Sequence, residues 1–211
     1  KNLYEKSKQL QWDAEQDLDW SIAIDPSKPL VDEARNGVDQ IPILQKLSKS
    51  QRETFTAHST AHLLSQFLHG EQGALLVASQ LVSCAPTYQA KLYAASQTFD
   101  EARHVEVFAR YIKEIHGIEY PINKSLKALI DKILSDERWD LKFIGMQIII
   151  EGLALAAFQT TKETSNCPLL RQLVHYVIRD EARHVTFGVN YLQEFLETLS
   201  EEEVEDRAMF A

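Results

Sequence analysis

Hydrophobic side chains recur every three or four residues along most of the chain, which is the spacing of one face of an α-helix. The spacing predicts four long helices, over residues 48–83, 87–116, 137–164 and 169–199, with a short helix over 126–134 between the second and the third. No segment alternates hydrophobic and polar residues in the manner of a β-strand. The sequence therefore predicts an all-α protein. Clear examples of the spacing are Leu64, Phe67, Leu68, Leu75, Ala78 and Val82, and later Val174, Val177, Ile178, Val185 and Leu192.

The first 47 residues have a weaker pattern than the rest of the chain. We expect a helix over 3–18 and then irregular structure to about residue 31, because Pro26 and Pro29 do not fit a helix interior. These residues are expected to form an extension that packs on a helical core over 48–199. The whole chain, 1–211, is expected to be one domain.

Six residues, DEARHV, occur twice, at 100–105 and at 180–185. Thirty residues before the glutamate of each copy stands another glutamate, Glu71 for the first copy and Glu151 for the second. A turn signal, SCAPTY or SNCP, lies midway in each interval, so each interval predicts two antiparallel helices. At about 1.5 Å per residue, the second helix returns the chain to the level of the first glutamate. Each helix pair then places one glutamate opposite a Glu-x-x-His motif, and two pairs form a four-helix bundle.

The carboxylates of this repeat lie on hydrophobic helix faces that a bundle must bury. A buried carboxylate stays ionised only when it is paired or bound to a metal. Two divalent cations balance four glutamates, and two neutral imidazoles complete the set. Iron is the first choice of metal for such ligands and manganese the alternative, whereas zinc prefers fewer carboxylates. The candidate metal ligands are Glu71, Glu101, His104, Glu151, Glu181 and His184.

Charge and composition restrict the partners and the location. The formal net charge of −9 argues against a nucleic-acid partner, which needs clustered Lys and Arg. We find no hydrophobic run near the roughly 18 residues that a membrane span requires, and no signal peptide, so a cytoplasmic location is expected. Cys84 and Cys167 are expected to be reduced thiols in the two hairpin turns, at the same end of the bundle.

The order Glu, Glu-x-x-His, Glu, Glu-x-x-His over residues 48–199 resembles the ferritin-like di-iron carboxylate superfamily. The twin DEARH motif and the N-terminal QWDAEQDLDWS are similar to its oxidase and oxygenase branch, which includes arylamine N-oxygenases, multicomponent monooxygenases and ribonucleotide reductase small subunits. The resemblance implies a ferritin-like four-helix bundle with extra N-terminal and connecting helices. It also implies that each motif's aspartate accepts from the histidine of the other motif and pairs with the arginines. These supporting residues are Asp100, Arg103, Asp180 and Arg183.

The sequence departs from each of these families at the positions below, and Glu71 stands where the ribonucleotide reductase small subunits usually have Asp as the first ligand. Phe108 stands where ribonucleotide reductase small subunits have the radical tyrosine, so a stable tyrosyl radical is not expected. Leu155 replaces a threonine of the multicomponent monooxygenases, and Val177 replaces an additional histidine of the arylamine N-oxygenases. No one branch fits fully.

The expected function is that of a non-haem di-iron oxidase or oxygenase, which activates O2 to oxidise a small apolar or aromatic molecule in an adjacent pocket. An external electron donor is expected, because no flavin or nicotinamide motif is present, and a homodimer is considered. The alternatives are a ferroxidase or iron-handling protein and a peroxide-handling enzyme of the manganese-catalase type. Residues one helical turn from the ligands are candidate pocket walls: Phe67, Leu75, Phe108, Gln147, Leu155 and Val177.

Overall fold

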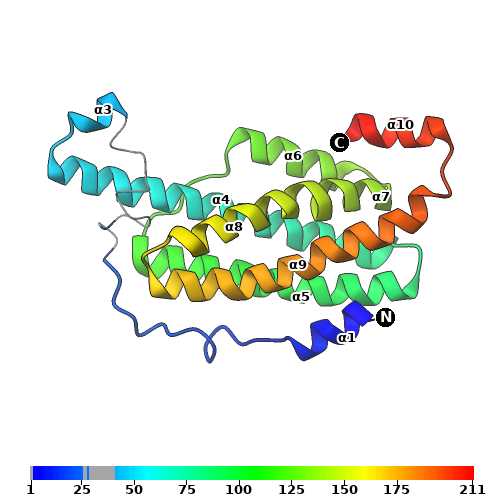
Figure 1. Cartoon of the computed structure of the whole chain (residues 1–211), viewed down its shortest axis with the longest axis horizontal. Coiled ribbons are helices and arrows are strands. Elements are labelled where there is room, and N and C mark those ends of the chain that lie inside the picture. Colours follow the sequence, from blue (N-terminus) through cyan, green and yellow to red (C-terminus); the bar gives the residue numbers. More distant parts are fainter. Residues whose placement is uncertain (1, 26–27, 29–40) are drawn as a thin grey trace.

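The computed structural model describes residues 2–25, 28 and 41–211 (Figure 1). Every element of these residues is helical, which confirms the predicted all-α class. Two elements, η2 and η3, are π-helical. In chain order the elements are α1 Asn2–Gln9, α3 Pro42–Gln45, α4 Lys49–Cys84, α5 Tyr88–Tyr111, η2 Ile112–His116, α6 Lys124–Ser135, α7 Trp139–Lys142, η3 Phe143–Ile150, α8 Glu151–Thr164, α9 Pro168–Leu196 and α10 Glu201–Phe210.

Four long helices, α4, α5, α8 and α9, lie side by side as a bundle (Figure 1). Helices α4 and α5 form one antiparallel pair, and α8 and α9 form the other. Between the pairs the chain crosses the length of the bundle through α6, which lies on its outside. A single long crossover of this kind is the connectivity of ferritin-like bundles.

The two hairpin turns lie at opposite ends of the bundle, so the expectation that Cys84 and Cys167 lie at the same end was wrong (Figure 1). Cys167 Sγ is 3.2 Å from the hydroxyl of Tyr111, at the end of α5. Lys91, near the start of α5, donates to the carbonyl of Ser83, next to Cys84. Lys91 and Tyr111 lie 20 residues apart in α5, which separates the two turns by about 30 Å. The crossover through α6 causes the difference, because it reverses the second hairpin along the bundle. Both cysteines are free thiols.

The helix predicted over 137–164 is present but is not α-helical throughout. Its middle part, η3, is π-helical and ends immediately before Glu151. A π-helix has more residues per turn than an α-helix, so its buried face does not follow the α-helical spacing. In an α-helix Ile148 would share the buried face of Glu151, but its side chain is 37% exposed, whereas Gly145 and Met146 are buried.

Two hydrophobic clusters fill the bundle, one on each side of a polar layer that crosses all four helices. The first cluster includes Leu64, Leu68, Phe108, Phe158, Leu173 and Val177. The second includes Val77, Leu81, Tyr93, Phe143, Met146 and Phe187. The polar layer, which contains the DEARH motifs, lies between these two groups on each helix. Because both neighbouring layers are apolar, charges in the polar layer must be balanced within it.

The N-terminal helix is shorter than predicted, since α1 ends at Gln9 and not near residue 18. The chain leaves the helix there so that the next two side chains reach the polar layer. Gln11 Nε2 lies 3.3 Å from Asp100, and Trp12 Nε1 donates to Asp180 at 2.7 Å. The prolines that were expected to break a helix, at positions 26 and 29, lie outside the described residues.

One helical run among the described residues, Trp139–Thr164, is long and apolar enough to cross a membrane by length and composition. The expectation that the chain has no such run was therefore wrong. Half of its most apolar window is buried inside the bundle, where a core helix needs apolar side chains. The run also contains Glu151, which is 2% exposed and faces the polar layer.

A close approach between α9 and η3 depends on Gly188. A Cβ at this position would lie 2.7 Å from Cβ of Gln147. We expect Gly188→Ala to lower the free energy of unfolding by about 1–3 kcal/mol, because the two helices must move apart. Urea denaturation followed by circular dichroism measures this change.

Gly152 supplies the matched control for this substitution. It is also helical, and a Cβ there meets no described atom within 4 Å. We expect Gly152→Ala to leave stability unchanged or to raise it by up to about 1 kcal/mol, because alanine favours helix. Equal stability of Gly188→Ala and the wild type would contradict the packing argument.

Candidate metal centre

The six predicted ligands meet in the polar layer at the middle of the bundle. Glu71 comes from α4, Glu101 and His104 from α5, Glu151 from the first residue of α8, and Glu181 and His184 from α9. Each of the six is 4% exposed or less. Their ligand atoms form two overlapping groups, and within each group all atoms lie within 4.8 Å of one another. The groups are Glu71, Glu101, His104 and Glu181, and then Glu101, Glu151, Glu181 and His184.

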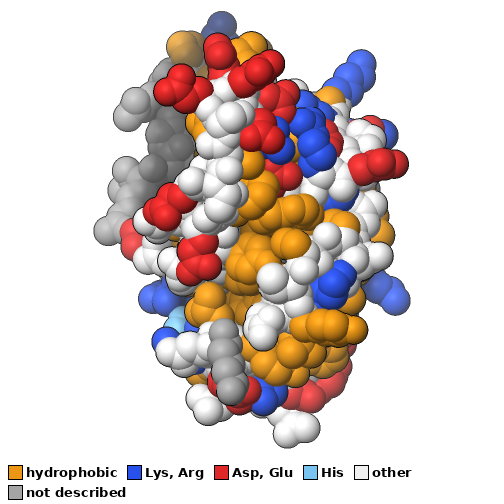
Figure 2. Space-filling model, turned by 90° about the vertical axis from the view of Figure 1, so that its right-hand side faces the viewer, with side chains coloured by type: hydrophobic (Ala, Val, Ile, Leu, Met, Phe, Trp, Pro, Cys, Tyr) orange, Lys and Arg blue, Asp and Glu red, His pale blue; other side chains and the backbone are white. Residues whose placement is uncertain are grey.

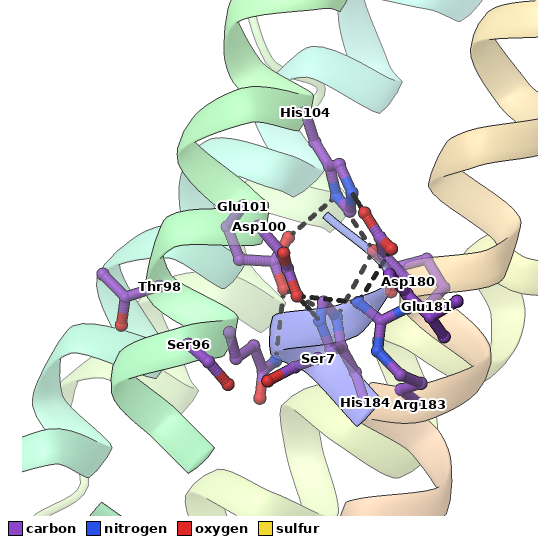
Figure 3. Close-up of polar contacts among 12 residues, drawn as sticks. Ser7, Ser96, Thr98, Asp100, Glu101, His104, Asp180, Glu181, Arg183 and His184 are labelled. Carbon is purple, nitrogen blue, oxygen red and sulfur yellow. Dashed lines mark hydrogen bonds and ion pairs between the residues drawn. The ribbon is translucent and has the colours of Figure 1, made fainter. Parts of the chain in front are cut away.

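The same ring nitrogen, Nδ1, of each histidine faces the carboxylates (Figure 3). His104 Nδ1 is 3.1 Å from Glu71 and 3.1 Å from Glu181. His184 Nδ1 is 3.1 Å from Glu101. Glu101 and Glu181 belong to both groups and therefore lie where they can serve two cations at once.

The opposite nitrogen, Nε2, of each histidine faces the aspartate of the other DEARH motif. His104 Nε2 is 3.3 Å from Asp180, and His184 Nε2 is 3.3 Å from Asp100. An aspartate at Nε2 holds the proton there, so that Nδ1, once it has lost its own proton, directs its lone pair at the carboxylate cluster. Each imidazole is thus held, with Nδ1 towards the carboxylates, by an aspartate of the opposite helix.

Two arginines bridge the aspartates of the two motifs. Arg103 donates to Asp100 at 2.7 Å and to Asp180 at 2.9 Å. Arg183 donates to Asp100 at 3.0 Å and lies 2.8 Å from Asp180. Both arginines are 6% exposed. These contacts balance the charge of the aspartates and connect α5 to α9 next to the carboxylate cluster.

Sequence reasoning missed the contacts that the N-terminal segment makes with this network. Gln11 Oε1 accepts from Arg103 at 2.7 Å. The indole of Trp12 donates to Asp180, and its ring lies 4.6 Å from the Arg103 guanidinium. Trp12 was expected only to pack. The partners of Gln11 and Trp12 lie about 90 and 170 positions away in the sequence, and no repeating pattern of residues predicts contacts over such intervals.

Sequence reasoning also missed the hydrogen bonds of two buried glutamines, one of which, Gln147, was expected only as a pocket wall. Gln97 is fully buried and donates to Glu101 at 3.1 Å and to Glu151 at 2.8 Å. Gln147 donates to Gln97 at 3.4 Å. The available signal was position, since Gln97 precedes Glu101 by one helical turn on the same apolar face. These amides hold two of the carboxylates in fixed orientations.

The cluster has strongly shifted pKa values. Burial and the charge of Glu181 raise the pKa of Glu71 and of Glu151 well above the usual range. Burial opposes protonation of His104, but the charge of Glu71 and the hydrogen bond to Asp180 outweigh it, so the pKa of His104 is raised. For the pKa of His184, the charges of Glu101 and Glu181 outweigh burial in the same way. Without cations, bound protons therefore balance the carboxylates, and cation binding would release them.

Several buried atoms of the predicted ligands make no hydrogen bond within the described residues: Glu151 Oε2, both carboxylate oxygens of Glu181 and His184 Nδ1. Glu181 Oε1 and His184 Nδ1 do have charged neighbours at 3.1 Å, but these contacts lack hydrogen-bond geometry. Leaving buried acceptors unpartnered is costly, and a bound cation would serve as the partner of all of them. Four carboxylates and two imidazoles suit iron or manganese. The residues therefore fit a two-metal centre.

A cavity of about 230 Å³ connects the surface with this centre. Glu71, Glu151 and Glu181 line it and are buried, whereas Leu153, which also lines it, is 67% exposed. The cavity lies between α4, α6 and the η3–α8 run. Its other lining residues are Gln66, Phe67, Gly70, Ala74, Leu126, Leu129, Ile150, Ala154, Ala157 and Phe158.

Of the predicted pocket walls, only Phe67 lines this cavity. The others do not contribute to it: Leu75, Phe108, Gln147, Leu155 and Val177. Val177, at the position of the expected additional histidine, is fully buried in the first hydrophobic cluster. The expectation failed because the cavity opens towards α6, and helical spacing around the ligands says nothing about where α6 packs.

A second hollow, of about 360 Å³, contains none of the six predicted ligands. It is lined by residues of α1, α5 and α9, among them Tyr4, Tyr93 and Tyr191. These residues lie towards the end of the bundle that Figure 2 faces, where hydrophobic side chains form a band between groups of charged ones. The cavity beside Glu71 is thus the better candidate for access to the centre.

Comparison with known proteins places this geometry in a family context. The family model of the p-aminobenzoate N-oxygenase AurF matches residues 1–209. None of the curated proteins matches significantly.

Solved structures of R2-like ligand-binding oxidases are similar in fold. One of them, a point mutant with an aerobically reconstituted Mn/Fe cofactor, has a TM-score of 0.69 at 20% identity, over 99% of this chain and 77% of that chain. The oxidase from Sulfolobus acidocaldarius has a TM-score of 0.59 at 19% identity, over 99% of this chain and 85% of that chain. The likeness confirms the ferritin-like bundle.

Proposed function

Since the chain belongs to the p-aminobenzoate N-oxygenase AurF family, we propose that it binds two metal ions at its six buried ligands and uses O2 to oxidise a small organic substrate. Membership of this family makes the chain an oxidoreductase with a two-metal carboxylate centre. The observation that carries the proposal is the pair of overlapping ligand groups at the end of a cavity.

The proposed ligands divide between two cations according to the two groups. One cation would be held by Glu71 and His104 and the other by Glu151 and His184, while Glu101 and Glu181 belong to both groups and could serve either. Iron is the proposed metal at both positions, with manganese as the alternative. When bound, the two metals supply the redox chemistry that activates O2.

The remaining residues prepare the site for this chemistry. Asp100 and Asp180 hold the histidine Nε2 protons, so that both Nδ1 atoms stay free to bind a cation. Gln97 holds Glu101 and Glu151 in position by hydrogen bonds. The hydrophobic clusters on both sides exclude water, and the cavity admits a substrate next to Glu71.

The proposed reaction needs a source of electrons outside the described site. Insertion of one atom of O2 into a substrate consumes two electrons and two protons from elsewhere and releases water. We therefore propose an external electron donor. A homodimer and a cytoplasmic location remain predictions.

Anaerobic loading with Fe(II), followed by exposure to O2, tests the proposed function. We expect about two irons per chain, as the six-ligand arrangement requires, and a diferric Mössbauer signal after O2 is consumed. Labelled oxygen should appear in the product of an arylamine substrate when a chemical reductant is supplied. Iron content near zero in the wild type would contradict the proposal.

The same experiment separates the alternative functions. Consumption of O2 with Fe(II), without labelled product from any substrate, would favour a ferroxidase. Rapid disproportionation of hydrogen peroxide by manganese-loaded protein would favour a catalase-type enzyme.

A further inference from the structure

Two glycines lie next to proposed ligands, Gly70 before Glu71 and Gly152 after Glu151. Both are in helices, and a Cβ built at either would meet no described atom within 4 Å. At Gly73, by contrast, a Cβ would lie 2.7 Å from a side chain of α6. Glycine destabilises a helix interior relative to alanine. Helix packing therefore explains Gly73 but gives no reason for glycine at position 70.

The surroundings of the two unexplained glycines differ in one respect. Gly70 lines the cavity that reaches the proposed metal centre, and Gly152 does not. Gly70 and Glu71 both line the cavity, and the space over Gly70 is free of described atoms. A larger side chain at position 70 would occupy it.

The part of the cavity wall that the structure describes offers no partner for a charged substrate group. Apart from the three proposed ligands, its only polar side chain among these residues is Gln66, and the amide of Gln66 is already used. Its Nε2 donates to the Pro121 carbonyl at 3.2 Å, and its Oε1 accepts from the backbone and side-chain nitrogens of Asn123 at 2.8 and 2.9 Å. No Lys, Arg or His within the described ranges lines the cavity. An anionic group buried against this part of the wall would thus lose its hydration without compensation from a cationic side chain.

The size and the aromatic residues of the cavity indicate what fits. About 230 Å³ exceeds the roughly 150 Å³ that holds a benzene molecule, so one ring with a small substituent fits. Phe67 and Phe158 line the cavity, and their rings lie edge to face with their centroids 4.8 Å apart. A substrate ring can therefore pack against an existing aromatic pair.

We propose that this cavity takes the uncharged ring of a small aromatic substrate and that Gly70 sets its width beside Glu71. The proposal rests on the proposed function and makes it more specific. The proposed substrate differs from p-aminobenzoate, the carboxylate-bearing compound for which the family is named. A ring carboxylate would meet no cationic side chain among the described residues of the cavity.

Calorimetric titration of the anaerobic, Fe(II)-loaded protein tests the proposal without turnover. The probes are aniline, which is uncharged at neutral pH, and p-aminobenzoate. We expect the wild type to bind aniline at least tenfold more tightly than p-aminobenzoate. Gly70→Val should weaken aniline binding tenfold or more with unchanged iron content. Gly152→Val, the matched control, should change the affinity for aniline less than twofold.

Several results would overturn the proposal. Unchanged aniline affinity in Gly70→Val would remove the role of Gly70, and tighter binding of p-aminobenzoate would remove the preference for an uncharged ring. If Gly70→Val does not fold, Gly70→Ala replaces it, and unchanged aniline affinity in that variant counts equally against the role. Failure of the proposed function is seen separately, as wild-type protein that binds no iron or consumes no O2.

Discussion

Replacing Glu181 with glutamine is expected to reduce bound iron from about two ions per chain to well below one, and to abolish O2 consumption. Glu181 belongs to both ligand groups, so loss of its negative charge weakens both cation positions at once. Mass spectrometric metal analysis after anaerobic loading and gel filtration measures the first effect, and an oxygen electrode measures the second. Wild-type iron content in Glu181→Gln would show that this carboxylate is not a ligand.

The metal-free protein provides a check that this variant is folded. Burial, and after it the charge of Glu181, raises the pKa of Glu71 and of Glu151, as expected for carboxylates that repel one another when no cation is bound. Glutamine removes that charge while keeping the shape. We therefore expect metal-free Glu181→Gln to melt at the same temperature as the metal-free wild type or above it, whereas iron should raise the melting temperature of the wild type only.

Glu71→Gln is the matched comparison, because Glu71 belongs to one group only. It should retain more iron than Glu181→Gln after the same treatment. Equal losses of bound iron in the two variants would contradict the assignment of Glu181 as the shared ligand.

The proposed ligands could be predicted from the sequence because their arrangement depends on helix geometry over short intervals. Helical spacing places Glu101 and His104 on one face, and the interval of 30 residues from Glu71 to Glu101 returns the chain to the same level. The pairing of each histidine with the opposite aspartate came from the resemblance to the superfamily, and the distances of 3.3 Å agree with it.

Features that depend on packing between distant segments could not be predicted from helical spacing. The crossover through α6 decides both the end at which Cys167 lies and where the cavity opens. The π-helical segment before Glu151 moves Ile148 to the surface, since nothing in the hydrophobic spacing marks the extra residue per turn. Trp12 reaches Asp180 across 168 positions, and no periodicity connects them.

Asp180→Ala is expected to lower the free energy of unfolding of the metal-free protein by about 3–5 kcal/mol, the range for breaking a buried ion pair from one side. Asp180 is fully buried and accepts from Trp12 at 2.7 Å and Arg103 at 2.9 Å, with Arg183 2.8 Å away. Alanine leaves these donors without that partner, away from water. Urea denaturation followed by circular dichroism measures the loss.

An exposed ion pair serves as the control for this loss. Asp131 pairs with Lys127 on the surface of α6, where both side chains are more than half exposed. Asp131→Ala should leave the urea midpoint nearly unchanged, because water replaces the lost contact. A similar shift in both variants would show that burial of the Asp180 network contributes nothing particular to stability.

Asp180→Asn tests the role of the same residue in metal binding. Asparagine keeps the shape and one acceptor oxygen, so most of the hydrogen bonds to Trp12 and Arg103 can persist. It removes the charge that fixes the Nε2 proton of His104, and we expect the affinity for Fe(II) to fall by about 10–100-fold. Competition with a chelator of known affinity measures this change. If Asp180→Asn binds iron as tightly as the wild type while Asp180→Ala unfolds more easily, Asp180 stabilises the bundle but does not orient the ligand.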